Sequence, residues 1–180
     1  MNLPNRITLA RVLMIPLYLV VYIAEPLSHV PNMWLALVIF SIASITDAVD
    51  GYVARKYGLV TNFGKLVDPL ADKLLVSAAI IAFVGSGALP AWAVILLISR
   101  EFYVSGLRLL AVEQGIVLAA SGGAKFKTAA QITLVIYILL PIGLFSFDWL
   151  VTIILWVTIV ASVWSAVDYT IKNKGVFKIS

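Results

Sequence analysis

The sequence predicts an all-α, polytopic membrane protein with six transmembrane helices and with both termini in the cytoplasm. Hydrophobic residues make up 62% of the 180-residue chain and charged residues only 12%, whereas soluble domains carry about 25% charged residues. A helix needs about 20 apolar residues to cross a bilayer, so six such helices with short loops use almost the entire chain. We therefore expect residues 1–180 to form a single transmembrane domain with the lipid bilayer as a partner.

Apolar runs between polar breaks locate the six spans. We predict them at residues 7–24, 33–57, 66–84, 90–112, 127–140 and 149–171. The intervening loops at 25–32, 85–89 and 141–148 contain no Lys or Arg, and most of the basic residues lie near the opposite ends of the spans. By the positive-inside rule, this asymmetry predicts a multi-pass protein of the cell membrane with cytoplasmic termini. The net charge of +4 therefore indicates orientation, and no nucleic-acid partner is expected.

Four aspartates lie at membrane depth on two neighbouring spans. Asp47 and Asp50 are spaced i, i+3 and Asp68 and Asp72 are spaced i, i+4, so each pair shares one face of its helix. At a rise of 1.5 Å per residue, Asp47 lies about 21 Å from the outer end of its span at residue 33, and Asp72 lies about 22 Å from Gly87 in the loop that follows its span. Pro69 follows Asp68 and is expected near a helix start, where its missing N–H costs nothing.

Carboxylates at this depth need a positive partner. A buried, unpaired charge costs several kcal/mol or is neutralised by a shift of its pKa. Hard divalent cations bind oxygen ligands, and two of them about 3.5–4 Å apart are a common arrangement for phosphoryl chemistry. A single intramembrane aspartate can instead form a hydrogen bond between helices, but four at these spacings favour a metal site.

The aspartates belong to a longer pattern, Asp47-x2-Asp50-Gly51-x2-Ala54-Arg55-x8-Gly64-x3-Asp68-x3-Asp72. It resembles the signature of the CDP-alcohol phosphotransferase family at every specified position. Members of that family have six transmembrane helices with cytoplasmic termini, so the resemblance extends over the whole chain. It implies transfer of a phosphatidyl group from CDP-diacylglycerol to an alcohol, with release of CMP on the cytoplasmic side, by a protein that forms a homodimer.

The resemblance also implies roles for individual residues. Asp47, Asp50 and Asp68 would bind two divalent cations, Mg²⁺ or Mn²⁺. Asp72 would lie near the same metals and would be the catalytic general base.

A second set of residues in the pattern is placed around the CDP moiety by the same resemblance. The small residues Gly51 and Ala54 would leave room for the nucleotide, and the guanidinium of Arg55 would bind phosphate oxygens. Arg55 has an alternative role as an orienting charge at the cytoplasmic surface.

Basic residues in spans four and five predict where the acceptor binds. Arg100 lies about 15 Å from the outer end of its span, and a charge at that depth indicates a functional site. Arg108 follows on nearly the same face, and Lys125 and Lys127 precede or open the next span. The neighbouring Glu101 is not expected to be the easiest partner for Arg100, because adjacent residues point about 100° apart on a helix. A cluster of this kind suits an acceptor that carries a phosphate, such as glycerol 3-phosphate.

Two further stretches carry a looser resemblance to the phosphatidylglycerolphosphate synthases of the same family, which use glycerol 3-phosphate. They are the opening Pro4-Asn5-x2-Thr8-x2-Arg11 and the segment from Arg100-Glu101-x6-Arg108 through Gly115, Ser121, Lys125-x-Lys127-Thr128 and Gln131. The lysines have an alternative role in orienting the helices.

Two other functions remain open at this point. Family members with the same donor use serine, inositol, inositol phosphate or phosphatidylglycerol as acceptors, and the aspartate pattern does not separate them. Intramembrane aspartates also mark cation or proton transporters. A transport route would need polar groups toward the outer face, yet the spans have no ionisable residue beyond Arg100 in that direction except at loop edges.

Overall fold

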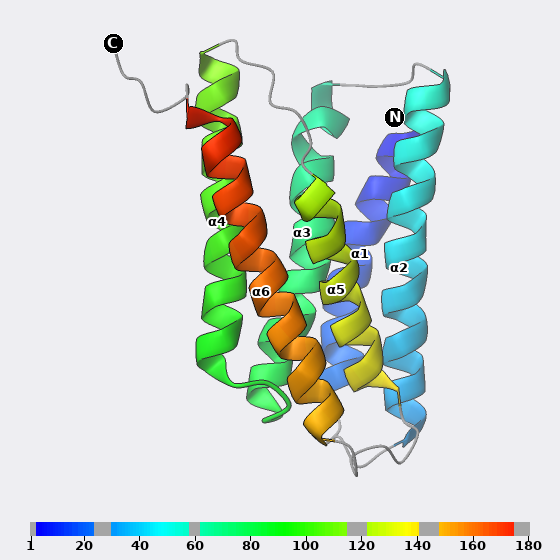
Figure 1. Cartoon of the computed structure of the whole chain (residues 1–180). Coiled ribbons are helices and arrows are strands. Elements are labelled where there is room, and N and C mark those ends of the chain that lie inside the picture. The colour runs from blue at the N-terminus through cyan, green and yellow to red at the C-terminus, as the bar shows by residue number, and fades with distance from the viewer. Residues whose placement is uncertain (1–2, 24–29, 58–61, 115–121, 141–147, 175–180) are drawn as a thin grey trace. The chain divides into compact units, whose positions relative to one another are not determined.

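The computed structural model consists of six α-helices within the residues that it describes (Figure 1). It describes the backbone of residues 3–23, 30–57, 62–114, 122–140 and 148–174, and the side chains of residues 10–23, 32–46, 73–111, 114, 123–140 and 149–174. In chain order the helices are α1 (Leu3–Ile23), α2 (Val30–Tyr57), α3 (Asn62–Gly85), α4 (Ala91–Glu113), α5 (Gly122–Leu139) and α6 (Asp148–Lys172). The prediction of six helices is confirmed.

Four helices begin three to five residues earlier than the apolar pattern predicts. α1 begins at Leu3 rather than at residue 7, and α2 begins at Val30 rather than at residue 33. α3 begins at Asn62 rather than at residue 66, and α5 begins at Gly122 rather than at residue 127. Pro69 therefore lies in the second turn of α3, and the prediction that it marks a helix start is wrong. A proline at that position has no N–H to donate to the carbonyl of Lys65. The polar residues before each apolar run continue the helix, which a search for apolar runs does not reveal.

The chain divides into two compact units. Unit 1 comprises Met1–Leu89 and Val135–Leu144, and unit 2 comprises Pro90–Leu134 and Phe145–Ser180. Unit 1 therefore holds α1, α2, α3 and the last residues of α5. Unit 2 holds α4, α6 and most of α5. The predicted metal-binding residues fall in unit 1 and the predicted acceptor-binding residues in unit 2.

In unit 1, α1 packs against both α2 and α3. Buried aromatic rings hold these helices together: the ring centroids of Tyr18 and Phe40 are 6.1 Å apart, and those of Tyr22 and Phe83 are 5.3 Å apart in an edge-on arrangement. The Tyr22 hydroxyl also hydrogen-bonds the hydroxyl of Ser86 at 2.8 Å, just after the end of α3. Since an edge-on aromatic pair contributes about 0.5–1.5 kcal/mol beyond its buried area, this cluster fixes the two helices that carry the aspartates.

In unit 2, α4 packs against α6. Val104 and Leu107 of α4 form a buried cluster with Tyr169 of α6. The rings of Trp92 and Trp156, also from α4 and α6, have centroids 5.8 Å apart. These contacts place the two helices side by side over most of their length, so polar side chains between the same contacts are held in a fixed position.

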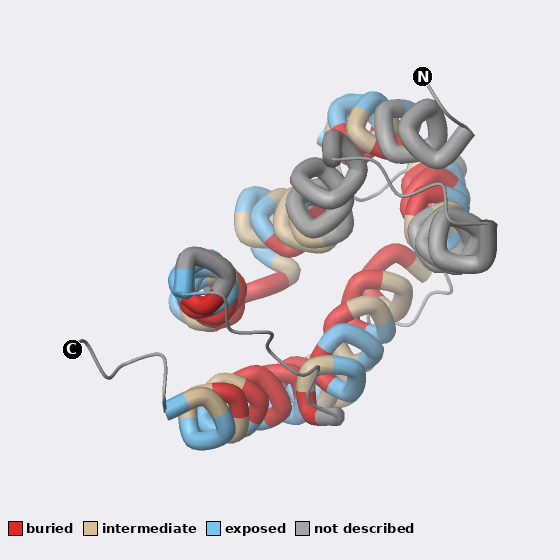
Figure 2. The backbone as a smooth tube through the Cα atoms, turned by 90° about the horizontal axis from the view of Figure 1, so that it is seen from above, coloured by how far each residue is buried: buried red, intermediate tan, exposed pale blue. Residues whose placement is uncertain are grey.

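Large apolar side chains are exposed on every helix of the structure. Figure 2 shows exposed as well as buried residues on each of them. Among the exposed residues are Leu17, Ile45, Ile81, Ile95 and Val160. Such exposure is unusual for a soluble protein and is typical of a surface that faces lipid.

Among the residues whose side chains are described, one helical segment is long and apolar enough to cross a bilayer. This is the segment Trp149–Lys172 of α6, with a mean hydropathy of 2.3. Shorter apolar helical segments lie at Ala10–Ile23, Asn32–Thr46 and Lys73–Gly85. The number of spans and the side on which the termini lie stay predictions.

Candidate functional site

All four aspartates of the predicted metal site lie on helices of unit 1. Asp47 and Asp50 lie in the C-terminal half of α2, and Asp68 and Asp72 lie in the N-terminal half of α3. These two helix halves lie at the same end of unit 1, which is the end at which α1 begins (Figure 1). Because the i, i+3 and i, i+4 spacings fall on continuous helix, each pair shares a helix face as predicted.

This backbone arrangement suits a divalent metal site. Two helices that pack in the same unit each bring two carboxylates, and hard cations such as Mg²⁺ prefer oxygen ligands. The side chains of the four aspartates, and those of Gly51, Ala54 and Arg55, lie outside the described residues. The ligand set and the residues around CDP therefore stay predictions. Among the side chains that are described, no group of three or more His, Cys, Asp or Glu residues could hold a metal ion.

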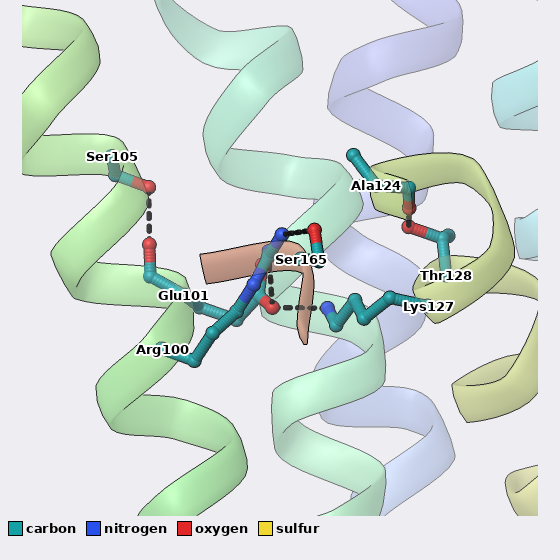
Figure 3. A network of polar contacts seen from close by, with 7 residues as sticks. All are labelled: Arg100, Glu101, Ser105, Ala124, Lys127, Thr128 and Ser165. Carbon is teal, nitrogen blue, oxygen red and sulfur yellow. Dashed lines mark hydrogen bonds and ion pairs between the residues drawn. The ribbon is translucent and has the colours of Figure 1, made fainter. Parts of the chain in front are cut away.

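A network of buried charged side chains connects α4, α5 and α6 in unit 2 (Figure 3). Arg100 and Glu101 are each 9% exposed and Lys127 is 3% exposed. The Nη1 group of Arg100 donates to Oε1 of Glu101 at 3.1 Å, and Nζ of Lys127 forms an ion pair with the same oxygen. The Nη2 group of Arg100 donates to the hydroxyl of Ser165 at 2.6 Å. One carboxylate oxygen thus bridges two cations that come from different helices.

The pairing of Arg100 with Glu101 differs from the expectation for adjacent helix residues. Their Cα–Cβ bonds do point in different directions. The arginine side chain is long enough to bring its guanidinium back to the carboxylate, and Lys127 draws that carboxylate toward the same place. Arg100 therefore does not need a substrate anion to neutralise its charge, because Glu101 already pairs with it.

One nitrogen of Arg100 remains without a hydrogen bond. Its Nε atom is buried and has no partner within the described structure. Arginine has five N–H donors in a planar fork and no acceptor, and leaving a buried donor without a partner costs about 1–3 kcal/mol. Arg100 therefore retains a buried donor that an additional oxygen ligand would satisfy.

The structure brings together only part of the predicted acceptor group. Arg100 and Lys127 share Glu101, as described above. Arg108 lies about two turns further along α4, about 12 Å from Arg100 along the helix axis. Its side chain is exposed, and its Nε group donates a hydrogen bond to the hydroxyl of Tyr169 at 3.3 Å. Lys125 is also exposed, and its side chain leaves α5 in a different direction from that of Lys127, since residues i and i+2 do not share a face.

Several polar residues of this region were missed by the sequence reasoning. α6 carries a buried row of hydroxyl side chains at Thr158, Ser162, Ser165 and Tyr169. Their spacing of i, i+4, i+7 and i+11 is that of a single helix face. Serine and threonine are common in membrane helices, so their presence in α6 does not by itself indicate a functional role. The regular spacing within a strongly apolar helix is the signal that would have found them.

Comparison with known proteins identifies a family for this chain. Residues 1–164 match the family model for CDP-alcohol phosphatidyltransferase, which covers both aspartate-bearing helices and the three charged residues of the network.

Individual relatives extend the likeness to almost the entire chain. The CDP-diacylglycerol–glycerol-3-phosphate 3-phosphatidyltransferase of Bacillus subtilis is 46% identical over 99% of this chain and 98% of its own length. A protein of the same name from Rickettsia felis is 38% identical over 93% of each chain. A probable phosphatidylglycerophosphate synthase of Mycobacterium tuberculosis is 40% identical over 79% of this chain and 68% of its own. The family resemblance seen in the aspartate pattern is thereby confirmed, and the chain belongs to the CDP-alcohol phosphatidyltransferase family.

Proposed function

We propose that this protein transfers the phosphatidyl group of CDP-diacylglycerol to sn-glycerol 3-phosphate, giving phosphatidylglycerol phosphate and CMP. The observation that carries the proposal is the 46% identity, over 99% of the chain, to a relative named for this reaction. The buried cations of unit 2 support it independently, because they suit an acceptor that carries a phosphate.

The reaction is the attack of an acceptor hydroxyl on the β-phosphorus of the donor. A new P–O bond forms to the acceptor oxygen, the bond between the β-phosphorus and the oxygen of CMP breaks, and CMP leaves. Asp72 accepts the proton of the attacking hydroxyl. A positioned general base of this kind contributes about 10²–10⁴-fold to a rate.

Asp47, Asp50 and Asp68, with Asp72 nearby, hold two divalent cations, Mg²⁺ or Mn²⁺. When bound, these cations neutralise the charge of the pyrophosphate, which is the main requirement of phosphoryl transfer. Gly51, Ala54 and Arg55 bind the CDP moiety on the same turns of α2.

The phosphate of glycerol 3-phosphate binds to the basic residues of unit 2. Arg100 and Lys127 supply two positive charges to this buried group, and Glu101 supplies one negative charge. The partnerless Nε of Arg100 is available to a phosphate oxygen. Arg108 and Lys125 add exposed positive charge to unit 2.

The membrane arrangement follows from the same residues. The six helices span the cell membrane with both termini in the cytoplasm, and the active site lies on the cytoplasmic side, where the basic residues are concentrated. The protein forms a homodimer, as the family resemblance implies.

The alternatives from the sequence are less well supported. Membership of a transferase family argues against a cation or proton transporter. The names of the relatives argue against serine, inositol, inositol phosphate or phosphatidylglycerol as the main acceptor.

An isotope experiment tests the proposed chemistry. Purified protein is supplied with CDP-diacylglycerol and with glycerol 3-phosphate that carries ¹⁸O in its hydroxyl groups. We expect both labelled oxygens to be retained in phosphatidylglycerol phosphate and none to appear in CMP, because the acceptor oxygen itself forms the new bond to phosphorus. Mass spectrometry of both products provides the measurement. Label in the nucleotide, or no lipid product at all, would contradict the proposal.

A further inference from the structure

Two hydroxyl groups of α6 bind the two arginines of α4, although α6 carries none of the residues that the family pattern specifies. Ser165 Oγ accepts from Nη2 of Arg100 at 2.6 Å, and Tyr169 Oη accepts from Nε of Arg108 at 3.3 Å. Both hydroxyl residues are buried, at 0% and 1% exposure. Ser165 and Tyr169 are four residues apart and lie on one face of α6.

The contact with Ser165 fixes the plane of the Arg100 guanidinium. Nη1 is bonded to Glu101 and Nη2 to Ser165, so two of the three nitrogens are held from two different helices. These two contacts, together with the covalent attachment of the guanidinium at Nε, fix the orientation of the planar group, and Nε is the nitrogen left without a partner. Charge-assisted and directional contacts of this kind are the reason that arginine recognises phosphate so specifically.

The contact with Tyr169 holds the Arg108 guanidinium at Nε rather than at its Nη groups. The ring of Tyr169 is packed against Val104 and Leu107 of α4, so its hydroxyl has a fixed position. That hydroxyl binds Nε of Arg108, and within the described residues the two Nη groups make no hydrogen bond. The end of the guanidinium, which can bind an oxyanion with two parallel hydrogen bonds, is therefore left open.

We propose that Ser165 and Tyr169 are positioning residues that orient Arg100 and Arg108 for the phosphate of the acceptor. Each hydroxyl engages one nitrogen of its arginine and leaves other N–H groups for the anion. α6 thus helps to determine acceptor specificity without touching the reacting atoms. This inference rests on the proposed function, since it concerns the same acceptor.

Steady-state kinetics of Ser165→Ala and Tyr169→Phe test the inference. Each substitution removes one hydroxyl and leaves the arginine in place but free to turn. We expect KM for glycerol 3-phosphate to rise about tenfold in each variant, the factor that corresponds to one hydrogen bond to a charged group. We expect kcat and KM for CDP-diacylglycerol to stay within about twofold of wild type. Arg108→Ala serves as a reference and should raise KM for the acceptor at least as much as Tyr169→Phe.

Three control variants lose a hydroxyl that contacts no arginine. Ser162 is fully buried one turn before Ser165 and its hydroxyl has no hydrogen-bond partner in the described structure. Tyr103 hydrogen-bonds Thr170 at 2.8 Å and so links the same two helices as Tyr169 does. Tyr22 is a buried tyrosine of unit 1 that is bonded to Ser86. Ser162→Ala, Tyr103→Phe and Tyr22→Phe should keep the wild-type KM for both substrates.

The outcomes separate this inference from the function on which it rests. If wild-type protein does not use glycerol 3-phosphate, the proposed function fails, and the inference fails with it before any variant is measured. If wild type uses it but either Ser165→Ala or Tyr169→Phe keeps the wild-type acceptor KM, only the inference is overturned. It is also overturned if either variant changes kcat or donor KM as much as acceptor KM, because that result indicates a general structural role.

Discussion

Replacing Asp47, Asp50 or Asp68 by asparagine is expected to lower the rate of transfer by about a hundredfold or more. Asparagine keeps the size and the carbonyl oxygen of aspartate but loses its negative charge, and divalent cations are bound through charged oxygen ligands. Loss of a residue that merely supports a metal ligand already costs about 10–100-fold in affinity or activity, so loss of a ligand itself should reach at least the upper end of that range. Removing the metal with excess chelator should have an equal or larger effect, reversible by adding Mg²⁺ or Mn²⁺.

Metal binding measured directly separates this effect from misfolding. Titration with Mn²⁺, followed by its electron paramagnetic resonance signal, should show weaker binding in all three variants. Asp168→Asn provides a matched control, because Asp168 lies on α6 and forms an i, i+4 ion pair with the exposed Lys172. It should bind metal and turn over like wild type. Undiminished activity in excess chelator would rule out the metal mechanism.

Replacing Asp72 by asparagine should affect turnover much more than binding. An asparagine at this position cannot accept the proton of the attacking hydroxyl, so we expect kcat to fall by about 10²–10⁴-fold. KM for CDP-diacylglycerol should change by no more than about twofold, since a general base acts in the transition state. Steady-state kinetics with varied donor concentration provide the measurement.

A different result with Asp72→Asn would contradict the assignment of Asp72 as the general base. If the variant loses affinity for donor and metal but turns over normally once saturated, Asp72 is a metal ligand and not the base.

The helices could be predicted from the sequence because each has a long, mostly apolar segment. All six were found, and the errors lie at their polar ends. α5 continues through Lys125 and Lys127 to Gly122, and α3 continues through Pro69 to Asn62. Hydropathy reports where a helix can face lipid, whereas hydrogen bonding of the backbone decides where the helix ends, so the two boundaries differ.

The candidate site could also be predicted only in part. The aspartate pattern could be recognised because its spacing fixes which residues share a helix face. The contacts of Arg100 could not be predicted, because a long side chain can turn back to Glu101 and because the partner on α6, Ser165, is remote in sequence. Contacts between helices depend on how those helices pack, and no local pattern in the chain encodes that packing.

The measurement that tests the central claim most directly is a product assay with a panel of acceptors. Purified wild-type protein is given CDP-diacylglycerol, Mg²⁺ or Mn²⁺, and in separate reactions glycerol 3-phosphate, glycerol, serine, inositol, inositol phosphate or phosphatidylglycerol. Release of CMP and the mass of the lipid product are followed together. We expect phosphatidylglycerol phosphate from glycerol 3-phosphate, and at least about a tenfold lower kcat/KM with glycerol, which cannot form the charge-assisted hydrogen bonds of a phosphate. A preference for serine or inositol, or equal use of glycerol and glycerol 3-phosphate, would contradict the assignment.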